Sequence, residues 1–320
     1  IFLESSSPKL YNKVQLTDFI NLYQFDKEIR SILSNCLDSV EEKLKASIAY
    51  HFCKHHCVSL TDTMQYTNKV HFMDPANNVP GTPTYCRYSN AYPFVGYQNQ
   101  KIYHEFDKFC LFKPFFLSNL VDKNDHIDIS FYFDSAYVAP SGVAVYRDST
   151  GTYNKNVAVP FWVAIETLTF GEILRLLHYL QDDVLKDVLN DFNLPLSKRA
   201  PFLNMIDILL CLRNNCAHTT LLNRFRTEKR YRINTLLITS FSLTPKNADS
   251  VLKLYDSIKI LSFFTDVTAL RKPLKILKFK MYTNMGIKKG KTTYNKLLAR
   301  MGCGDYKKWN TALFKTKYFL

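Results

Sequence analysis

The sequence predicts a mainly α-helical protein with a partly β insertion and a basic C-terminal extension. Apolar residues recur every three or four positions over long stretches on both sides of residues 58–160, which is the period of an amphipathic helix. Proline, glycine and tyrosine are concentrated between those stretches. With 320 residues, 47% of them hydrophobic, the chain can bury a full core, which excludes disordered chains and disulfide-stapled miniproteins.

The helical period begins at Leu16 and continues to about Cys57. We expect Asp18, Phe19 and Ile20 to open a first helix, and a second, long helix to follow it. The long helix carries one apolar stripe at steps of three and four. Its members are Ile29, Ile32, Leu33, Cys36, Leu37, Val40, Leu44, Ile48 and Phe52.

Residues 58–160 have a different composition, with prolines and glycines at intervals that interrupt any long helix. Within them, residues 127–133 alternate between apolar and polar, and Pro140-Ser141-Gly142 precedes the apolar run Val143–Tyr146. This pattern predicts a pair of strands joined by a loop. We expect an insertion that lies across a helical domain of residues 1–267, rather than a separate domain.

Helices are expected again after Pro160. Thr169 and Glu172 have the spacing of a capping box, in which each side chain accepts a hydrogen bond from a free backbone N–H group at a helix start. Further helices are predicted over residues 182–190, from 200 to about 216, and from near Pro245. The last of these would carry Val251, Leu254, Ile258 and Leu261.

The segment Leu209–His218 is the strongest candidate for chemistry, because an apolar run ends in Arg, two Asn and His. On a helix, Asn214 and His218 share a face, whereas Arg213 lies about 140° from His218. A guanidinium binds two phosphoryl oxygens at once, and an imidazole transfers protons near neutral pH. RNA also carries its own nucleophile, the ribose 2′-OH. The alternative is that Arg213 and His218 only cap or salt-bridge the helix end.

The Arg-Asn-x-Cys-Ala-His ending resembles the Abi-like (AbiD/AbiF) abortive-infection family, whose core is similar to the HEPN fold with its R-x4–6-H motif. Other blocks agree with that family in the expected order. They are Leu22–Arg30 (L-Y-x-F-D-[RK]-x-[LI]-R), Glu41 with Ala49-Tyr50-His51, Val159–Gly171 (P-x-W-x-x-x-E-x-x-[ST]-F-G), Phe192–Pro195 and Asn223-Arg224.

The resemblance implies a HEPN-like helical bundle and an RNA-binding phage-defence protein of the cytoplasm. It implies a metal-independent endoribonuclease toxin that uses Arg213 and His218, with Asn214 orienting the substrate or the His. It also implies control by a cognate noncoding RNA. The alternative is a non-catalytic module that holds a small noncoding RNA.

The resemblance also predicts a homodimer. HEPN-type sites place two R-x4–6-H motifs side by side, and a possible second motif in this chain, Lys45 to His51, has Lys where the family usually has Arg. Lys cannot reproduce the bidentate fork of Arg. A two-fold axis places the same patch of both copies together, so we expect His218 near that axis.

The C-terminal extension, residues 268–320, carries fourteen Lys and Arg against one acid, Asp305, and therefore +13 of the formal charge of +14. A neutral body with a basic end is typical of nucleic-acid binders. Interleaved aromatic residues would stack on unpaired bases (Phe279, Tyr282, Tyr294, Tyr306, Trp309 and Phe314). The alternative is a basic helix pair whose aromatic rings face the core. The predicted RNA-binding residues are Lys272, Lys275, Lys278, Lys280, Lys288, Lys289, Lys291, Lys296, Arg300, Lys307 and Lys308.

Three other patterns resemble functional motifs but are expected to have structural roles only. The Gly286–Thr292 run has one residue too few between its glycines for a phosphate-binding loop, so we expect a basic turn. Metal-ligand residue types gather between His51 and Cys57, but no second pair completes a zinc site, and we expect no metal or cofactor. The acidic residues at 182–191 are expected to lie on a solvated helix face.

The composition also predicts the compartment. Eight scattered cysteines are typical of buried thiols in a reducing cytoplasm. No apolar run reaches the roughly 18 residues that a membrane-spanning helix needs. We therefore expect a soluble cytoplasmic protein that does not associate with membranes.

Overall fold

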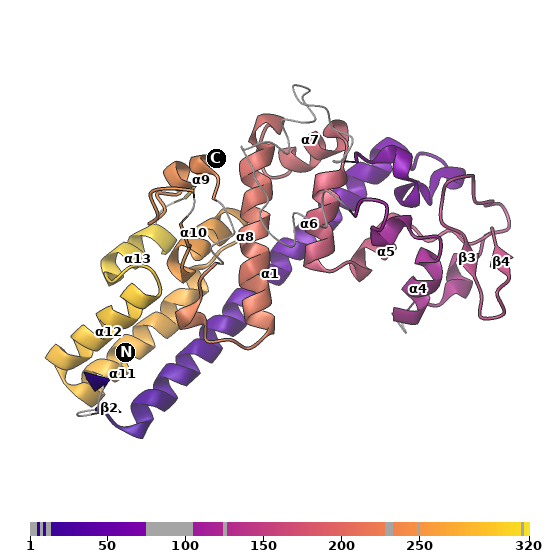
Figure 1. Cartoon of the computed structure of the whole chain (residues 1–320). Coiled ribbons are helices and arrows are strands. Elements are labelled where there is room, and N and C mark those ends of the chain that lie inside the picture. Colours follow the sequence, from indigo (N-terminus) through magenta and orange to yellow (C-terminus); the bar gives the residue numbers. More distant parts are fainter. Residues whose placement is uncertain are drawn as a thin grey trace. The chain divides into compact units, whose positions relative to one another are not determined.

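The computed structural model describes residues 5–6, 9–10, 14–74, 105–123, 127–227, 233–248, 250–314 and 317–320, and these are mostly helical, as predicted (Figure 1). The chain divides into two compact units. The first unit is formed by Ile1–Val40 together with Asn204–Leu320, and the second by Glu41–Leu203. Predicted features at residues 75–104 and 124–126, among them several of the prolines, lie outside the described residues.

The long N-terminal helix α1 runs from Leu16 to His56 without a break. The predicted helix is confirmed, but its division into two helices is wrong. Neither Pro nor Gly interrupts the sequence between these residues, so nothing ends the first helix. The predicted apolar stripe is buried from Ile29 to Phe52, apart from Ile32 and Cys36 at its margin.

The second unit contains the C-terminal part of α1 and several short helices. The capping box is confirmed, since the Thr169 backbone N–H donates to Glu172 Oε2 at 2.8 Å and Glu172 N–H donates to Thr169 Oγ1 at 3.3 Å. The helices of this unit are η1 Leu60–Asp62, η2 Gln65–Thr67, η3 Lys69–His71, η5 Cys110–Phe112, α4 Phe116–Lys123, η6 Ile129–Tyr132, α5 Phe161–Ala164, η7 Ile165–Thr167, α6 Phe170–Tyr179, α7 Asp182–Asn190 and η8 Leu196–Lys198.

The insertion contains less β structure than the sequence predicts. Strand β3 (Tyr146–Arg147) pairs antiparallel with β4 (Tyr153–Asn154) around a tight turn. The predicted strand over residues 127–133 is wrong, because η6 occupies its place. Asp128 Oδ1 accepts a hydrogen bond from Ser130 N–H at 2.9 Å and thereby satisfies a donor that a strand ladder would need. A further strand pair, β1 (Ser5–Ser6) with β2 (Lys9–Leu10), precedes α1.

The first unit is built around α8 (Arg199–Ala217), which enters it at residue 204, and a set of C-terminal helices. The helix predicted near Pro245 begins only at Leu254. Leu252 is held outside a helix because it exchanges hydrogen bonds with Thr227, whose N–H donates to Leu252 O at 3.0 Å. The remaining helices are η9 Leu222–Arg224, α9 Thr235–Ser240, α10 Leu254–Phe264, η10 Thr268–Leu270, α11 Arg271–Met285, α12 Ile287–Arg300 and α13 Tyr306–Phe314.

Helices α11 and α12 form an antiparallel hairpin around Gly286, whose φ of 77° suits glycine (Figure 1). Gly290 allows the two helices to approach each other closely, since a Cβ there would overlap with the Met281 carbonyl. The Gly286–Thr292 run is therefore a helix junction, with no strand before it. Leu274, Leu277 and other apolar residues of the hairpin are buried.

Candidate functional site

The Arg213–His218 segment lies where α8 emerges from the core. All residues from 201 to 212 are buried, whereas Arg213 is half-buried and Asn214 and His218 are exposed. A helix whose residues are mainly apolar around its whole circumference belongs in the interior of a protein. The polar residues at its end therefore mark the point at which it reaches solvent.

The backbone after α8 is fixed by local hydrogen bonds. His218 N–H donates to Asn214 O at 3.0 Å, and Thr219 adopts a left-handed φ of 51°, which is unusual for a β-branched residue. The Thr220 hydroxyl lies 3.0 Å from Asn215 O and 3.1 Å from its Oδ1. His218 therefore lies at the end of α8, directly before a turn whose backbone is held by hydrogen bonds.

A buried carboxylate on α1 holds the chain that follows. Asp26 is fully buried and accepts hydrogen bonds from Leu222 N–H at 3.0 Å, from Asn223 N–H at 2.8 Å and from Asn223 Nδ2 at 2.8 Å. The Arg30 guanidinium binds both Asp26 Oδ2 at 3.2 Å and Thr220 O at 3.0 Å. These five residues, the Asp26 clamp, fix the segment that leaves His218, because a buried carboxylate is costly unless its oxygens are hydrogen-bonded.

The three predicted catalytic side chains have no partner within the described part of the chain. No hydrogen bond or ion pair there involves the side chain of Arg213, Asn214 or His218, so the structure joins none of them to another. Their functional groups remain available to a ligand. Burial raises the pKa of the nearby Cys216 thiol to about 11, so this cysteine stays protonated and is a poor nucleophile.

The possible second motif is fully engaged by carboxylates of the second unit. Lys45 is buried, and its Nζ lies 3.1 Å from Glu41 Oε1 and 3.5 Å from Glu166 Oε2. His51 is buried as well, with Nε2 3.0 Å from Asp191 Oδ2. These pairings hold both side chains within the second unit, although the buried His51 Nδ1 has no hydrogen bond.

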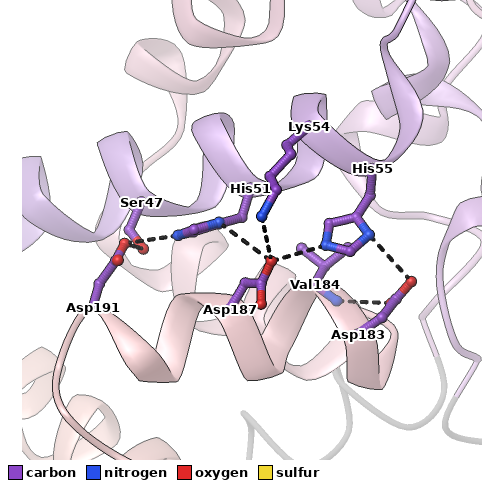
Figure 2. A network of polar contacts seen from close by, with 8 residues as sticks. All are labelled: Ser47, His51, Lys54, His55, Asp183, Val184, Asp187 and Asp191. Atoms are coloured by element: carbon purple, nitrogen blue, oxygen red, sulfur yellow. Dashed lines mark hydrogen bonds and ion pairs between the residues drawn. The ribbon is translucent and has the colours of Figure 1, made fainter.

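The acidic residues of α7 also differ from their predicted role. Figure 2 shows that Asp183, Asp187 and Asp191 face α1 rather than solvent alone. Asp187 Oδ2 lies 3.0 Å from His55 Nε2 and 3.2 Å from Lys54 Nζ. The hydrogen bond from His55 lowers the pKa of the Asp187 carboxyl. The assignment to a purely solvated face is therefore wrong, because these carboxylates join two helices.

Most of the predicted RNA-binding cations lie on the surface of the first unit. Lys278 sits 5.1 Å from the centre of the Tyr306 ring. Lys278, Lys280, Lys289 and Arg300 are half-buried, and the exposed cations are Lys272, Lys275, Lys288, Lys291, Lys296, Lys307 and Lys308. The described cations of the extension thus form an accessible basic surface.

The aromatic residues of the extension only partly match the prediction. Tyr294 and Trp309 belong to the core, where Tyr294 donates its hydroxyl hydrogen to Leu274 O at 3.0 Å. The prediction that they stack on bases is wrong, because Tyr294 is buried between the two helices of the hairpin and the Trp309 ring packs against Tyr255 of α10, with 4.9 Å between the ring centres. Phe279 is 70% exposed and remains a candidate. The side chain of Phe314 lies outside the described residues.

Within the described ranges, no three His, Cys, Asp or Glu residues are arranged to hold a metal ion. None of the described helices combines the length and apolar character needed to cross a membrane.

Sequence reasoning assigned no role to Asp26 and Arg30, although both belong to a block that resembles the family. The signal was present, because Asp26 follows the buried Phe25 on the core face of α1 and Arg30 stands four residues later. An acid on a core face requires buried donors. The partner segment near Asn223 could not be identified from the sequence alone.

Comparison with known proteins identifies a family for most of the chain. The family model described as Abi-like protein matches residues 1–223, which include the Asp26 clamp and the Arg213–His218 segment. The C-terminal extension lies beyond the match. Comparisons with curated proteins and with solved structures give no match.

Proposed function

The chain belongs to the Abi-like protein family, and we propose that this abortive-infection protein binds RNA and cleaves it at the Arg213–His218 segment. The proposed fold of the cleaving domain is a HEPN-like helical bundle, residues 1–267. Membership of the family indicates defence against phage. The RNA chemistry is proposed from the residues of the site.

One observation carries the proposal: two complementary side chains are unpaired where hydrogen bonds hold the backbone. Arg213 and His218 have no described partner, while Asn215, Thr220 and the Asp26 clamp hold the backbone around them. A side chain that is already positioned before the substrate binds contributes to catalysis, because the entropy cost of ordering it is not incurred during the reaction.

The proposed reaction uses the nucleophile that RNA carries. The His218 imidazole accepts the proton of the ribose 2′-OH while the O2′–P bond forms. The P–O5′ bond breaks, and the departing 5′ oxygen takes up a proton. Arg213 binds the phosphoryl oxygens as charge develops on them. The products are a 2′,3′-cyclic phosphate and a 5′-hydroxyl end.

The reaction needs two proton transfers, and this requirement favours a homodimer. One imidazole cannot easily accept the 2′-OH proton and protonate the leaving oxygen in a single step, and Lys45 and His51 are engaged elsewhere. A two-fold axis would supply a second His218. We therefore propose a composite site formed by two copies of the chain.

The alternative proposal is a non-catalytic module that holds a small noncoding RNA. The observation that favours it is the accessible basic surface of the extension, which needs no reaction to explain it. Cations of this kind neutralise phosphates and give strongly salt-dependent binding. A toxin held inactive by its cognate RNA would combine both roles.

The two proposals are separated by identifying the RNA and testing its cleavage. The protein is purified, the RNA that copurifies is sequenced, and that RNA is incubated with the protein in the presence of EDTA. Endoribonuclease activity predicts cleavage that persists in EDTA and leaves 2′,3′-cyclic phosphate ends. Intact RNA that remains bound supports the non-catalytic module, and no bound RNA at any salt concentration contradicts both proposals.

A further inference from the structure

Two segments of the first unit that lie close together carry three arginines. Arg224 ends η9, Arg226 follows two residues later, and Arg300 is the last residue of α12. Arg224 and Arg226 are exposed, and Arg300 is half-buried. We call these residues the arginine cluster.

Backbone contacts bring these segments together. Arg226 forms an isolated antiparallel β-bridge with Lys253, the residue before α10. Tyr255 N–H donates to Met301 O at 2.8 Å, and Lys253 Nζ lies 3.5 Å from Ala299 O. The start of α10 therefore contacts both the Arg226 segment and the end of α12. These contacts place Arg300 in the same region as Arg224 and Arg226.

Among the residues that the structure describes, no acidic side chain neutralises the charge of the arginine cluster. No described carboxylate forms an ion pair with Arg224, Arg226 or Arg300. Burial lowers the pKa of Arg300, and the positive charges of Arg224 and Arg226 lower it further. Like charges at short range destabilise a fold unless an anion offsets them.

We propose that the arginine cluster is a binding site for the phosphates of the RNA strand that the Arg213–His218 segment acts on. This inference rests on the proposed function, and it adds a defined phosphate site to the basic surface. Guanidinium groups bind phosphate oxygens in bidentate fashion, which orders a strand more strictly than exposed lysines do.

The position of the cluster along the chain suits this role. Arg224 directly follows Asn223, which Asp26 holds, and it is six residues beyond His218. A fully extended chain advances at most about 3.6 Å per residue, so Arg224 Cα lies within roughly 22 Å of His218 Cα. A strand bound at the arginine cluster is thereby kept within a few nucleotides of His218.

The test compares variants of the full-length protein in binding a short, labelled single-stranded RNA over a range of salt concentrations. The variant R224Q/R226Q removes two exposed charges, and K108Q/K113Q removes two exposed charges of the second unit as a matched control. R224K/R226K retains the charge but removes the bidentate fork. Unfolding temperatures verify that each variant is folded.

We expect R224Q/R226Q to bind RNA at least about ten-fold more weakly than the control for each phosphate that the cluster no longer binds. The salt dependence, as log K against log salt, should flatten by about 0.7 for each such phosphate. R224K/R226K should restore the salt slope but not the full affinity. Inorganic phosphate should compete weakly with RNA for the wild type.

The outcomes distinguish this inference from the proposed function. If the wild type binds and cleaves RNA but R224Q/R226Q matches the control, the arginine cluster is not a phosphate site and the proposed function stands. If R224Q/R226Q loses affinity for RNA as expected but neither the wild type nor any variant cleaves RNA, the phosphate site stands and the endoribonuclease assignment fails. If the wild type binds inorganic phosphate but binds no RNA, the assignment of the arginine cluster to RNA is overturned.

Discussion

Asp26 Oδ1 accepts hydrogen bonds from both the backbone N–H and the side-chain Nδ2 of Asn223, each at 2.8 Å, although 197 positions separate the two residues. The contact connects the start of the long N-terminal helix to the chain that leaves the Arg213–His218 segment. Because Asp26 is fully buried, water cannot replace the contact. We therefore expect it to stabilise the first unit and to hold the chain segment that follows His218.

Replacing Asp26 with Ala should destabilise the protein by about 3–5 kcal/mol, since it removes the carboxylate that pairs with the half-buried Arg30 and leaves the buried Leu222 and Asn223 N–H groups and the Asn223 amide without an acceptor. Asn223→Ala should cost less, about 1–2 kcal/mol, because it removes fewer hydrogen bonds. Urea unfolding measures both values. Glu28→Ala, an exposed substitution on the same helix, is the control. An Asp26→Ala protein as stable as the control would show that the Asp26 clamp does not hold this segment.

Replacing His218 or Arg213 with Ala should abolish most RNA cleavage while leaving the unfolding temperature nearly unchanged. The loss for His218→Ala is expected to reach about 10²–10⁴-fold, the usual contribution of general acid–base catalysis. Stability should persist because neither side chain has a described partner. Lys186→Ala, an exposed cation on α7, is the matched control. Loss of the fold in either variant would assign the motif a structural role.

The sequence predicted the helices well because their signals are local. The stripe of α1, the capping box at Thr169 and the bounds Asp182–Asn190 of α7 all depend on residues a few positions apart. The same logic failed over residues 127–133. There the alternation of apolar residues favours a strand, but the Asp128 side chain bonds to the backbone of a 3-10 turn.

The candidate site was predictable only in its centre. The apolar run before Arg213 identified the helix end, but the contacts that fix it come from Asp26 and Arg30, far away in sequence. Periodicity cannot pair a buried acid with its distant donors. For the same reason, it could not distinguish the aromatic residues of the extension that face the core, such as Tyr294, from those that remain exposed, such as Phe279.

If two copies of His218 form one site, mixing wild-type protein with an excess of the His218→Ala variant should inhibit cleavage. Mixed dimers would hold one imidazole in place of two, so activity should fall faster than the wild-type fraction. Light scattering should give the mass of a dimer. A monomer that cleaves RNA at an undiminished rate in such mixtures would contradict the composite site.

The basic surface is best tested by substituting its exposed lysines rather than by removing the extension. Truncation would remove Trp309, whose ring packs against that of Tyr255 in α10 with 4.9 Å between the ring centres, and would expose the core of the first unit. Lys272, Lys275 and Lys288 are exposed, and replacing them with Gln should flatten the salt dependence of RNA binding by about 0.7 for each phosphate that is no longer neutralised. The matched control is the triple replacement of Lys108, Lys113 and Lys186, which should leave the slope unchanged. An equal slope in both proteins would show that the extension does not contact RNA.

The second unit should lose stability as the pH falls below about 6.5, the ordinary pKa of histidine. The rings of His56 and His71 lie 4.4 Å apart, and burial is the largest cause that lowers the pKa of each. Repulsion from His71 lowers the pKa of His56 further, whereas Asp183 and Asp62 act in the opposite direction on His56 and His71 respectively.

A histidine with a lowered folded-state pKa binds its proton more readily in the unfolded chain, so acid favours unfolding. The loss begins as the pH falls through the unfolded value and is complete below the folded value. Partial exposure of both rings keeps it well below the limit of about 1.4 kcal/mol per pH unit for each proton. Urea unfolding at several pH values between 7.5 and 5 should show this decline, and His71→Gln should reduce it. His218→Gln, at an exposed position, should leave the slope as it is in the wild type. If His71→Gln has no effect on the slope, the pair formed by His56 and His71 does not cause the acid sensitivity.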